Sequence, residues 1–420
     1  MRRPWATAWL LFGFMLVNFA DKTVLGLCAE AVMDDLVLTR SQFGLAASSF
    51  FALFSLSALL VPLLARRVRT TVLLTVLAVL WSVAQLPMAL GAGFGVLVAT
   101  RLLLGAAEGP AAPLAVHHLH GWFAHRDRAL PTALVLAGAA GGVALAGPVI
   151  TTVTESLGWR WAFGIVAAAG LVWTVAWLLV GREPGDGGPA AEEATEQRGA
   201  DVGYRSVLLS GTVISAGVGA FAAYWLLSAS LTWMPDYLHE VLGISARGTG
   251  MVTMAAGLTT GVVLLVHGTI AGRRPASPGR FEGRGTAALI AVSACAVFVF
   301  ASGGPVWLRV ALFLGPMALA NVVLTVSQTA VARVCPPERR RVVLGAVACF
   351  YGLAGVLSPL VIGKIVDAAD NVAAGYRLAF LLTGALVAVA AVVVAVGLRP
   401  ERDAVRLAAG SDNAQRQVAV

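Results

Sequence analysis

The sequence predicts an all-α membrane protein with twelve transmembrane helices, arranged as two pseudo-symmetric six-helix bundles. Of its 420 residues, 58% are apolar and only 12% are charged, and the mean hydropathy is +0.83. A soluble domain carries roughly 25% charged residues. Twelve apolar stretches are each long enough for the roughly 20 residues of a spanning helix. Matching features also recur in the two halves of the chain, which indicates a duplicated bundle.

The twelve stretches follow one another with short loops between most of them, and the 46 glycines would let their backbones approach closely in lipid. Their expected bounds are 5–27, 42–65, 70–90, 94–118, 130–153, 162–180, 208–235, 248–271, 285–303, 305–332, 341–366 and 375–397. Two hydrophilic segments complete the organisation. We expect a first bundle over 1–180, a cytoplasmic linker over 181–206, a second bundle over 207–397 and a disordered cytoplasmic tail over 398–420.

The basic residues predict the orientation of these spans. Alternating loops divide them unequally, because the side that holds both termini carries 22 of the 30 Lys and Arg residues and the other side carries six. The positive-inside rule then places both termini in the cytoplasm of a cell-membrane protein. The net charge of +8 follows from this topology, so it does not indicate a nucleic-acid partner.

An internal repeat relates the two halves. Asp127, Arg128 and Pro148 recur 211 residues later as Glu338, Arg339 and Pro359. Duplicated six-span halves are typical of transporters, with the substrate site between them near the midplane. We expect the glycines and prolines near the repeat to form close helix contacts about which the halves rock; they are Gly138, Gly142, Gly147, Pro148, Gly355 and Pro359. We expect charged residues of the cytoplasmic loops to take part in the same gating and packing; they are Arg66, Arg67, Asp127, Arg128, Glu338 and Arg339.

Four charged residues fall well inside predicted spans: Asp21, Lys22, Arg101 and Glu108. An ionised side chain at a helix centre costs roughly 2.5–3.5 kcal/mol on insertion scales, so such residues normally serve function. Ion bridges that only fix helix packing are the alternative. Helical rise and rotation predict that Asp21 pairs with Arg101 and leaves Glu108 as a deeper, lone carboxylate.

These charges suggest a division of roles. A buried carboxylate beside cations can bind and release protons, which favours Glu108 as a proton-coupling group. Lys22 and Arg101 could hold an anionic substrate. At the repeat offset, Asp21, Arg101 and Glu108 correspond to Thr232, Leu312 and Leu319, so the second half is expected to shape the pocket with neutral groups. The neutral candidates for substrate binding are Tyr224, Trp225, Asn321 and Gln328.

No cofactor, metal or enzymatic site is expected. The histidines His117, His118, His120 and His125 lie at one end of the fourth span, where polar side chains meet water. Neither a carboxylate nor a cysteine joins them with the spacing of a zinc site. A clustered nucleophile or acid–base pair at a membrane face, as an enzyme would need, is also missing from the sequence.

These motifs together resemble the major facilitator superfamily over nearly the whole chain, and more narrowly its anion:cation symporter family, the group of sugar-acid and phthalate permeases, sialin and vesicular glutamate transporters. The resemblance rests on Asn18-Phe-Ala-Asp21-Lys22, on Arg101-Leu-Leu-Leu-Gly-Ala-Ala-Glu108, on Trp122-Phe-Ala-His-Arg-Asp127-Arg128 and on Trp233-Met-Pro-Asp-Tyr237. It implies that Asp21 and Glu108 take protons, that Arg101 holds a substrate carboxylate, and that the protein is a monomer.

Several positions depart from that family pattern. Lys22 replaces the usual Arg and loses a bidentate fork for a carboxylate. The loop after the second span keeps the basic residues Arg66 and Arg67 but lacks the usual Gly and Asp. Polar positions of sugar-acid members are occupied by Ala139, Ala348 and Gly352, which favours a more apolar organic acid.

The expected function is therefore secondary active transport, a proton-coupled symport that takes up a small organic anion by alternating access. The alternative is proton-driven export of a drug-like or secondary-metabolite compound, which the depolarised pocket leaves open. The expected partners are the small-molecule substrate, protons and the lipid bilayer.

Overall fold

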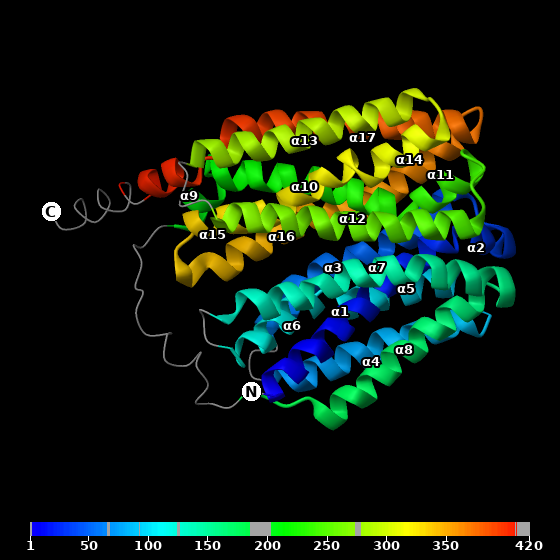
Figure 1. Cartoon of the computed structure of the whole chain (residues 1–420), viewed down its shortest axis with the longest axis horizontal. Coiled ribbons are helices and arrows are strands. Elements are labelled where there is room, and N and C mark those ends of the chain that lie inside the picture. The colour runs from blue at the N-terminus through cyan, green and yellow to red at the C-terminus, as the bar shows by residue number, and fades with distance from the viewer. Residues whose placement is uncertain are drawn as a thin grey trace. The chain divides into compact units, whose positions relative to one another are not determined.

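The computed structural model describes residues 2–64, 68–91, 93–123, 127–184, 203–273, 279–407 and 409. Within these residues the regular structure is helical and contains no strand, and 12 helical segments are long and apolar enough to cross a membrane. Lipid offers backbone N–H and C=O groups no partner, so apolar segments of this length satisfy them within helices. The predicted fold class is confirmed, and the protein is a multi-pass membrane protein (Figure 1).

The first half of the chain forms eight helices. Their bounds are α1 (Arg2–Leu27), α2 (Ala29–Leu36), α3 (Arg40–Leu64), α4 (Thr70–Ala89), α5 (Phe94–Glu108), α6 (Ala111–His120), α7 (Ala129–Leu157) and α8 (Trp159–Val180).

In the described part of the second half, the short helix α9 (Tyr204–Leu208) is followed by eight more helices and one 3-10 segment up to residue 397. Their bounds are α10 (Gly211–Thr232), α11 (Met234–Glu240), α12 (Ala246–Arg273), α13 (Gly279–Ser302), α14 (Val306–Leu314), η2 (Pro316–Asn321), α15 (Val322–Val334), α16 (Pro337–Asp367) and α17 (Val372–Gly397).

Two spans that hydropathy predicts as continuous are interrupted in the structure. The fourth span divides into α5 and α6 at Gly109 and Pro110, and the tenth divides at Gly315 and Pro316 into α14, η2 and α15. A proline removes one backbone donor and clashes with the preceding turn, so it divides or bends a helix without changing its apolar character. Glu108 is the last residue of α5 and therefore lies at such an interruption.

The chain divides into two compact units. The first comprises Met1–Thr195, Ser228–Gly261 and Gly355–Tyr376, and the second comprises Glu196–Leu227, Val262–Ala354 and Arg377–Val420. Parts of α10, α12 and α16 thus belong to the same unit as the first-half helices. The expected domain bounds of 1–180, 181–206 and 207–397 remain a prediction, and most of the linker lies outside the described residues.

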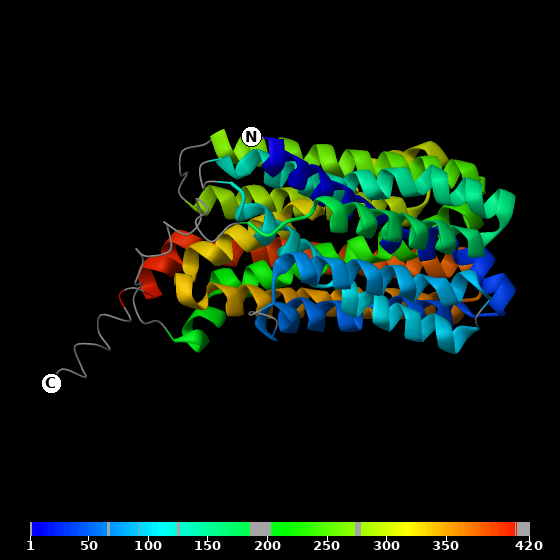
Figure 2. The same ribbon diagram turned by 90° about the horizontal axis from the view of Figure 1, so that it is seen from below.

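Close backbone packing organises the first unit. Helix α1 packs along α7, α3 along α5, and α4 along α8 and α5 (Figures 1 and 2). A Cβ at Gly138 would meet the Phe12 carbonyl oxygen, and one at Gly142 would meet the Leu16 carbonyl oxygen, so these glycines permit the α1–α7 contact. Gly147 makes the same kind of contact with Gly250 of α12.

The N-terminus of α4 is capped from the segment after α8. The Glu183 carboxylate accepts hydrogen bonds from the backbone N–H and hydroxyl groups of Thr70 and Thr71 at 2.7–3.1 Å. Partial burial acts to raise the pKa of Glu183, but these four hydrogen bonds outweigh it, and the pKa lies below its ordinary value. This contact ties α8 to the start of α4.

In the second unit, the start of the tail differs from expectation. We expected disorder from residue 398, but residues 400–407 are helical. The buried Asp403 carboxylate accepts hydrogen bonds from the backbone N–H and the hydroxyl of Thr212, both at 2.7 Å. It thereby accepts from a backbone N–H that would otherwise be unpaired at the N-terminus of α10. The polar composition of the tail alone does not predict this contact. Residues 408 and 410–420 lie outside the described residues.

Candidate functional site

The four intramembrane charges lie together in the first unit. Asp21 and Lys22 come from α1, and Arg101 and Glu108 from α5. Asp21, Arg101 and Glu108 are 0%, 2% and 1% exposed, and the Lys22 side chain is 9% exposed. Four charges buried this completely must compensate one another, because an isolated ion in an apolar medium is strongly disfavoured.

Lys22, and not Arg101, makes the direct ion pair. Its Nζ lies 3.4 Å from Oε2 of Glu108 and donates a hydrogen bond of 2.6 Å to Oδ1 of Asn18. It also lies 4.2 Å from the ring centroid of Phe19 and 4.9 Å from that of Phe54, within cation–π range. The expectation of a lone Glu108 was therefore wrong, since Lys22 reaches across from α1 to α5.

The expected Asp21–Arg101 pair is also absent, because no ion pair within 4.0 Å joins these two described side chains. Instead, Nη2 of Arg101 donates to Oε1 of Gln85 at 2.5 Å, and the guanidinium lies 5.4 Å from the Phe163 ring centroid. Neither carboxylate oxygen of Asp21 has a hydrogen-bond partner in the described part of the chain, and its charge interacts with those of Glu108, Arg101 and Lys22.

Helix packing accounts for this concentration of charge. Arg101 and Glu108 are seven residues apart and so share one face of α5. On α5, a Cβ at Gly105 would meet the Phe50 carbonyl oxygen, and one at Gly109, directly after the helix, would meet the Phe54 carbonyl oxygen. These glycines bring the backbone of α3 close enough for its phenyl rings to surround the charges.

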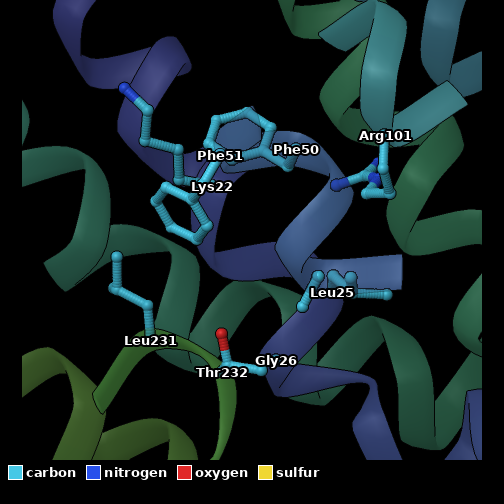
Figure 3. A pocket seen from close by; sticks show the side chains of 9 residues that line it. Lys22, Leu25, Gly26, Phe50, Phe51, Arg101, Leu231 and Thr232 are labelled. Carbon is cyan, nitrogen blue, oxygen red and sulfur yellow. The ribbon is translucent and has the colours of Figure 1, made fainter. Parts of the chain in front are cut away.

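The lining of one pocket in the first unit includes both Lys22 and Arg101. This pocket is lined by Lys22, Leu25, Gly26, Ala47, Phe50, Phe51, Arg101, Leu231 and Thr232. Figure 3 shows Lys22 and Arg101 on opposite sides of the two phenyl rings in this view, with the Thr232 hydroxyl pointing into the space between the chain segments. Apart from the two cations, Thr232 is the sole polar side chain of this lining.

The neutral candidates of the second half, Tyr224, Trp225, Asn321 and Gln328, all belong to the second unit. The rings of Tyr224 and Tyr351 lie 5.2 Å apart, and Tyr351 shares a hydrogen bond with the exposed Gln328. Trp225 donates to the Thr383 hydroxyl at 3.1 Å. Tyr351 was missed by sequence reasoning, although an aromatic residue one position before Gly352 in a glycine-rich span could have indicated it.

Asn321 serves its own helix instead. Its amide donates to the Ala318 carbonyl oxygen at 3.2 Å, at the junction of η2 and α15. This contact stabilises the interruption of the tenth span. A role of Asn321 in substrate binding remains a prediction.

The residues predicted for gating and packing are distributed over both units. Pro148 and Pro359 lie inside α7 and α16, and the Gly355 carbonyl accepts from Ser228 at 3.3 Å. Arg128 donates to the Phe123 carbonyl at 3.1 Å, and Arg339 lies over the Tyr204 ring at 4.7 Å.

Other members of that set have fewer described contacts. Asp127 is exposed. Glu338 belongs to α16, but its side chain lies outside the description. Arg66 and Arg67 also fall on residues that the structure does not describe.

Sequence reasoning missed an ionic network at the end of the first unit where α2 and α11 meet. The buried Asp236 carboxylate accepts from Nε of Arg40 at 3.1 Å and from the Tyr376 hydroxyl. The backbone N–H groups of Arg40 and Ser41 donate to Asp367 at 3.1 and 2.6 Å. We call these residues the Asp236 network. It joins the start of α3 to α11, the end of α16 and the start of α17.

A second contact lies at the same end of the unit. Nε2 of His239 lies 3.1 Å from Oε2 of Glu30, while its Nδ1 lies 2.8 Å from the Ile244 carbonyl oxygen.

Among the described residues, no group of three or more His, Cys, Asp or Glu side chains could hold a metal ion.

Comparison with known proteins is consistent with this geometry. The chain is similar to a hexuronate transporter of Bacillus subtilis, with 26% identity over 93% of this chain and 94% of that protein. It is also similar to a probable sulfoacetate transporter of Cupriavidus necator, with 25% identity over 93% and 94% of the two chains. A bacterial homologue of the human lysosomal transporter Spinster shares the fold, with a TM-score of 0.77, 17% identity and coverage of 95% of this chain and 98% of that one.

The family model described as Major Facilitator Superfamily matches residues 10–359 and 287–418. Together these two matches span nearly the whole chain. The fold, the buried charges and this match therefore agree that the chain is a transporter and not an enzyme, and that it belongs to the Major Facilitator Superfamily.

Proposed function

We propose that this protein takes up a small organic anion together with protons by alternating access. The relatives named above are transporters of hexuronate and, probably, sulfoacetate, both of which are anions. The observation that carries the proposal is the buried cluster of Asp21, Lys22, Arg101 and Glu108 in the first unit.

Charge balance provides the coupling mechanism. With all four groups ionised, the two acids and two cations sum to zero. An arriving anion leaves the cluster with one excess negative charge, which a low-dielectric site disfavours by several kcal/mol, so about one proton should follow it. Asp21 and Glu108 interact with each other, and a proton on either acid relieves their repulsion.

Arg101 is the stronger candidate for holding the substrate. Its Nε has no hydrogen-bond partner in the described part of the chain, and its side chain lines the pocket. A guanidinium offers a planar fork that fits a carboxylate or sulfonate, whereas Lys22 offers a point charge already directed at Glu108 and Asn18.

The pocket lining favours a compact or apolar acid over a polyhydroxylated one. Phe50, Phe51, Leu25 and Leu231 offer no partner for substrate hydroxyls, and buried hydroxyls without partners are unfavourable. We further propose a monomer in the cell membrane, with both termini cytoplasmic and the Asp236 network on the outer side, because the basic loops lie on the side of the termini.

The test separates transport from proton coupling. Glu108→Gln has nearly the shape of the protonated acid. In reconstituted vesicles it should still exchange sulfoacetate, D-glucuronate or benzoate, whichever the parent binds in a thermal-shift screen, down the anion's own gradient. It should fail to accumulate that anion when only a pH gradient is imposed. Asp21→Asn should show the same split if both acids carry protons.

The matched control is Glu155→Gln, which makes the same change at an exposed position near the end of α7. It should behave as the parent in both assays. If Glu108→Gln accumulates the anion from a pH gradient as well as the parent does, Glu108 is not a coupling residue and returns to the role of a packing ion bridge.

A further inference from the structure

Gln85 is a fully buried polar residue on α4 that contacts the proposed substrate-holding arginine. It is 0% exposed, and its Oε1 accepts the 2.5 Å hydrogen bond from Nη2 of Arg101. It does not line the pocket that contains Arg101. Gln85 therefore contacts Arg101 without belonging to the lining of the space that an anion would enter.

The contact holds Arg101 from one side and leaves other donors free. Only Nη2 of the guanidinium is occupied by Gln85, while Nε has no hydrogen-bond partner in the described part of the chain. The Phe163 ring centroid lies 5.4 Å from the guanidinium carbon, within cation–π range. A side chain with many rotamers is thus fixed before any substrate arrives, which lowers the entropic cost of binding.

The choice of an amide at this position has an electrostatic consequence. An amide oxygen accepts a hydrogen bond without cancelling the charge of the donor. A carboxylate at the same place would form an ion pair with Arg101 and leave three acids against two cations in the cluster. The neutral acceptor keeps the positive charge of Arg101 available for a transported anion.

We infer that Gln85 is a positioning residue, which orients Arg101 toward the pocket and, by being neutral, preserves its charge for the anion. This inference rests on the proposed function. A purely structural role makes a different prediction, because then only the strength of the Gln85–Arg101 contact would matter.

Two substitutions of similar size separate these roles. Gln85→Glu keeps the hydrogen bond and strengthens it with charge, whereas Gln85→Leu removes it. If Gln85 positions Arg101 and preserves its charge, Gln85→Glu should weaken anion binding at least tenfold. Gln85→Leu should raise the KM for exchange about three- to tenfold with little change in the maximal rate. A structural role predicts the reverse order, with Gln85→Leu the more damaging variant.

The assay measures binding and exchange of sulfoacetate, D-glucuronate and benzoate by the purified full-length protein, together with its apparent melting temperature. Gln42→Glu is the matched control, because Gln42 is exposed at the start of α3 and the change adds the same charge. Binding by Gln85→Glu within threefold of the parent, or a larger loss in Gln85→Leu than in Gln85→Glu, overturns the inference. If the parent binds none of the three anions, the proposed function itself fails.

Discussion

Removing the guanidinium of Arg101 should weaken anion binding, and the size of the loss should depend on how many hydrogen bonds to the anion each substitution removes. Arg101 is 2% exposed, and its direct hydrogen-bond partner in the described structure is the neutral Gln85. An incoming anion would therefore bind an arginine whose charge is not neutralised by a direct ion pair. Arg101→Met removes both arms of the fork, and Arg101→Lys leaves a point charge.

The magnitude follows from the hydrogen bonds that are lost. A hydrogen bond to a charged group contributes about 1.5–3 kcal/mol. Losing two should cost about 3–6 kcal/mol, and since 1.4 kcal/mol is tenfold, affinity should fall about 10²–10⁴-fold in Arg101→Met. Arg101→Lys loses one bond of the fork, so a fall of roughly 10- to 100-fold is expected.

Isothermal titration of the purified variants with the anion that stabilises the parent most would measure these ratios. The controls are Arg160→Met and Arg160→Lys, since Arg160 forms a partly exposed ion pair with Asp35 at 2.6 Å. Surface pairs of this kind contribute roughly 0–1 kcal/mol, so the controls should bind as the parent does. If Arg101→Met binds the anion unchanged, or if the preferred ligand is a cation, the assignment of Arg101 is refuted.

Three other perturbations test the structure around the site. Lys22→Met leaves Glu108 buried without its ion-pair partner and should cost about 3–5 kcal/mol of stability, read as a fall in melting temperature that the added Glu108→Gln change largely reverses. If the Asp236 network limits access from the proposed outer side to the pocket that Thr232 lines, Asp236→Asn should make a cysteine at Thr232 react faster with a membrane-impermeant maleimide in intact cells; an unchanged rate would exclude that role. Glu183→Ala removes the cap of α4 and should cost about 1 kcal/mol. Because the folded pKa of Glu183 is lowered, its contribution is fully present above the unfolded pKa of about 4.3 and is lost as pH falls through the lower folded pKa. The variant and the parent should therefore differ in melting temperature at pH 7 and converge only when pH falls below the folded pKa.

Most of the fold could be predicted because hydropathy reports the property that lipid selects. The expected spans lie within a few residues of the helices, as the first shows, expected over 5–27 and found as α1 at Arg2–Leu27. The interruptions at Pro110 and Pro316 could not be predicted from hydropathy, since a proline changes backbone hydrogen bonding and not apolarity. The helix at 400–407 was missed for a related reason, because a single buried acid, Asp403, holds a polar segment.

The site was predicted less completely than the fold. Burying charge in lipid is costly, so Asp21, Lys22, Arg101 and Glu108 could be identified from sequence, but their partners depend on how α1 and α5 face each other. Adjacent residues point about 100° apart around a helix, and this rotation is what turns Lys22 toward Glu108. Gln85 was missed because a neutral amide in a span carries no comparable signal until the arginine beside it is seen.

The balance of charge in the cluster also bears on the alternative of proton-driven export, in the case where the exported compound is a cation. When all four groups are ionised, an incoming anion can be neutralised by one proton added to Asp21 or Glu108, so substrate and proton travel in the same direction. An incoming cation would instead leave one excess positive charge, and it could be balanced only by releasing a proton that ionised acids no longer hold. Proton-driven export of a cation would therefore suit a cluster with one cation fewer. With Lys22 and Arg101 both buried beside the two acids, this balance supports the proposed anion–proton symport over exchange of a cation for a proton.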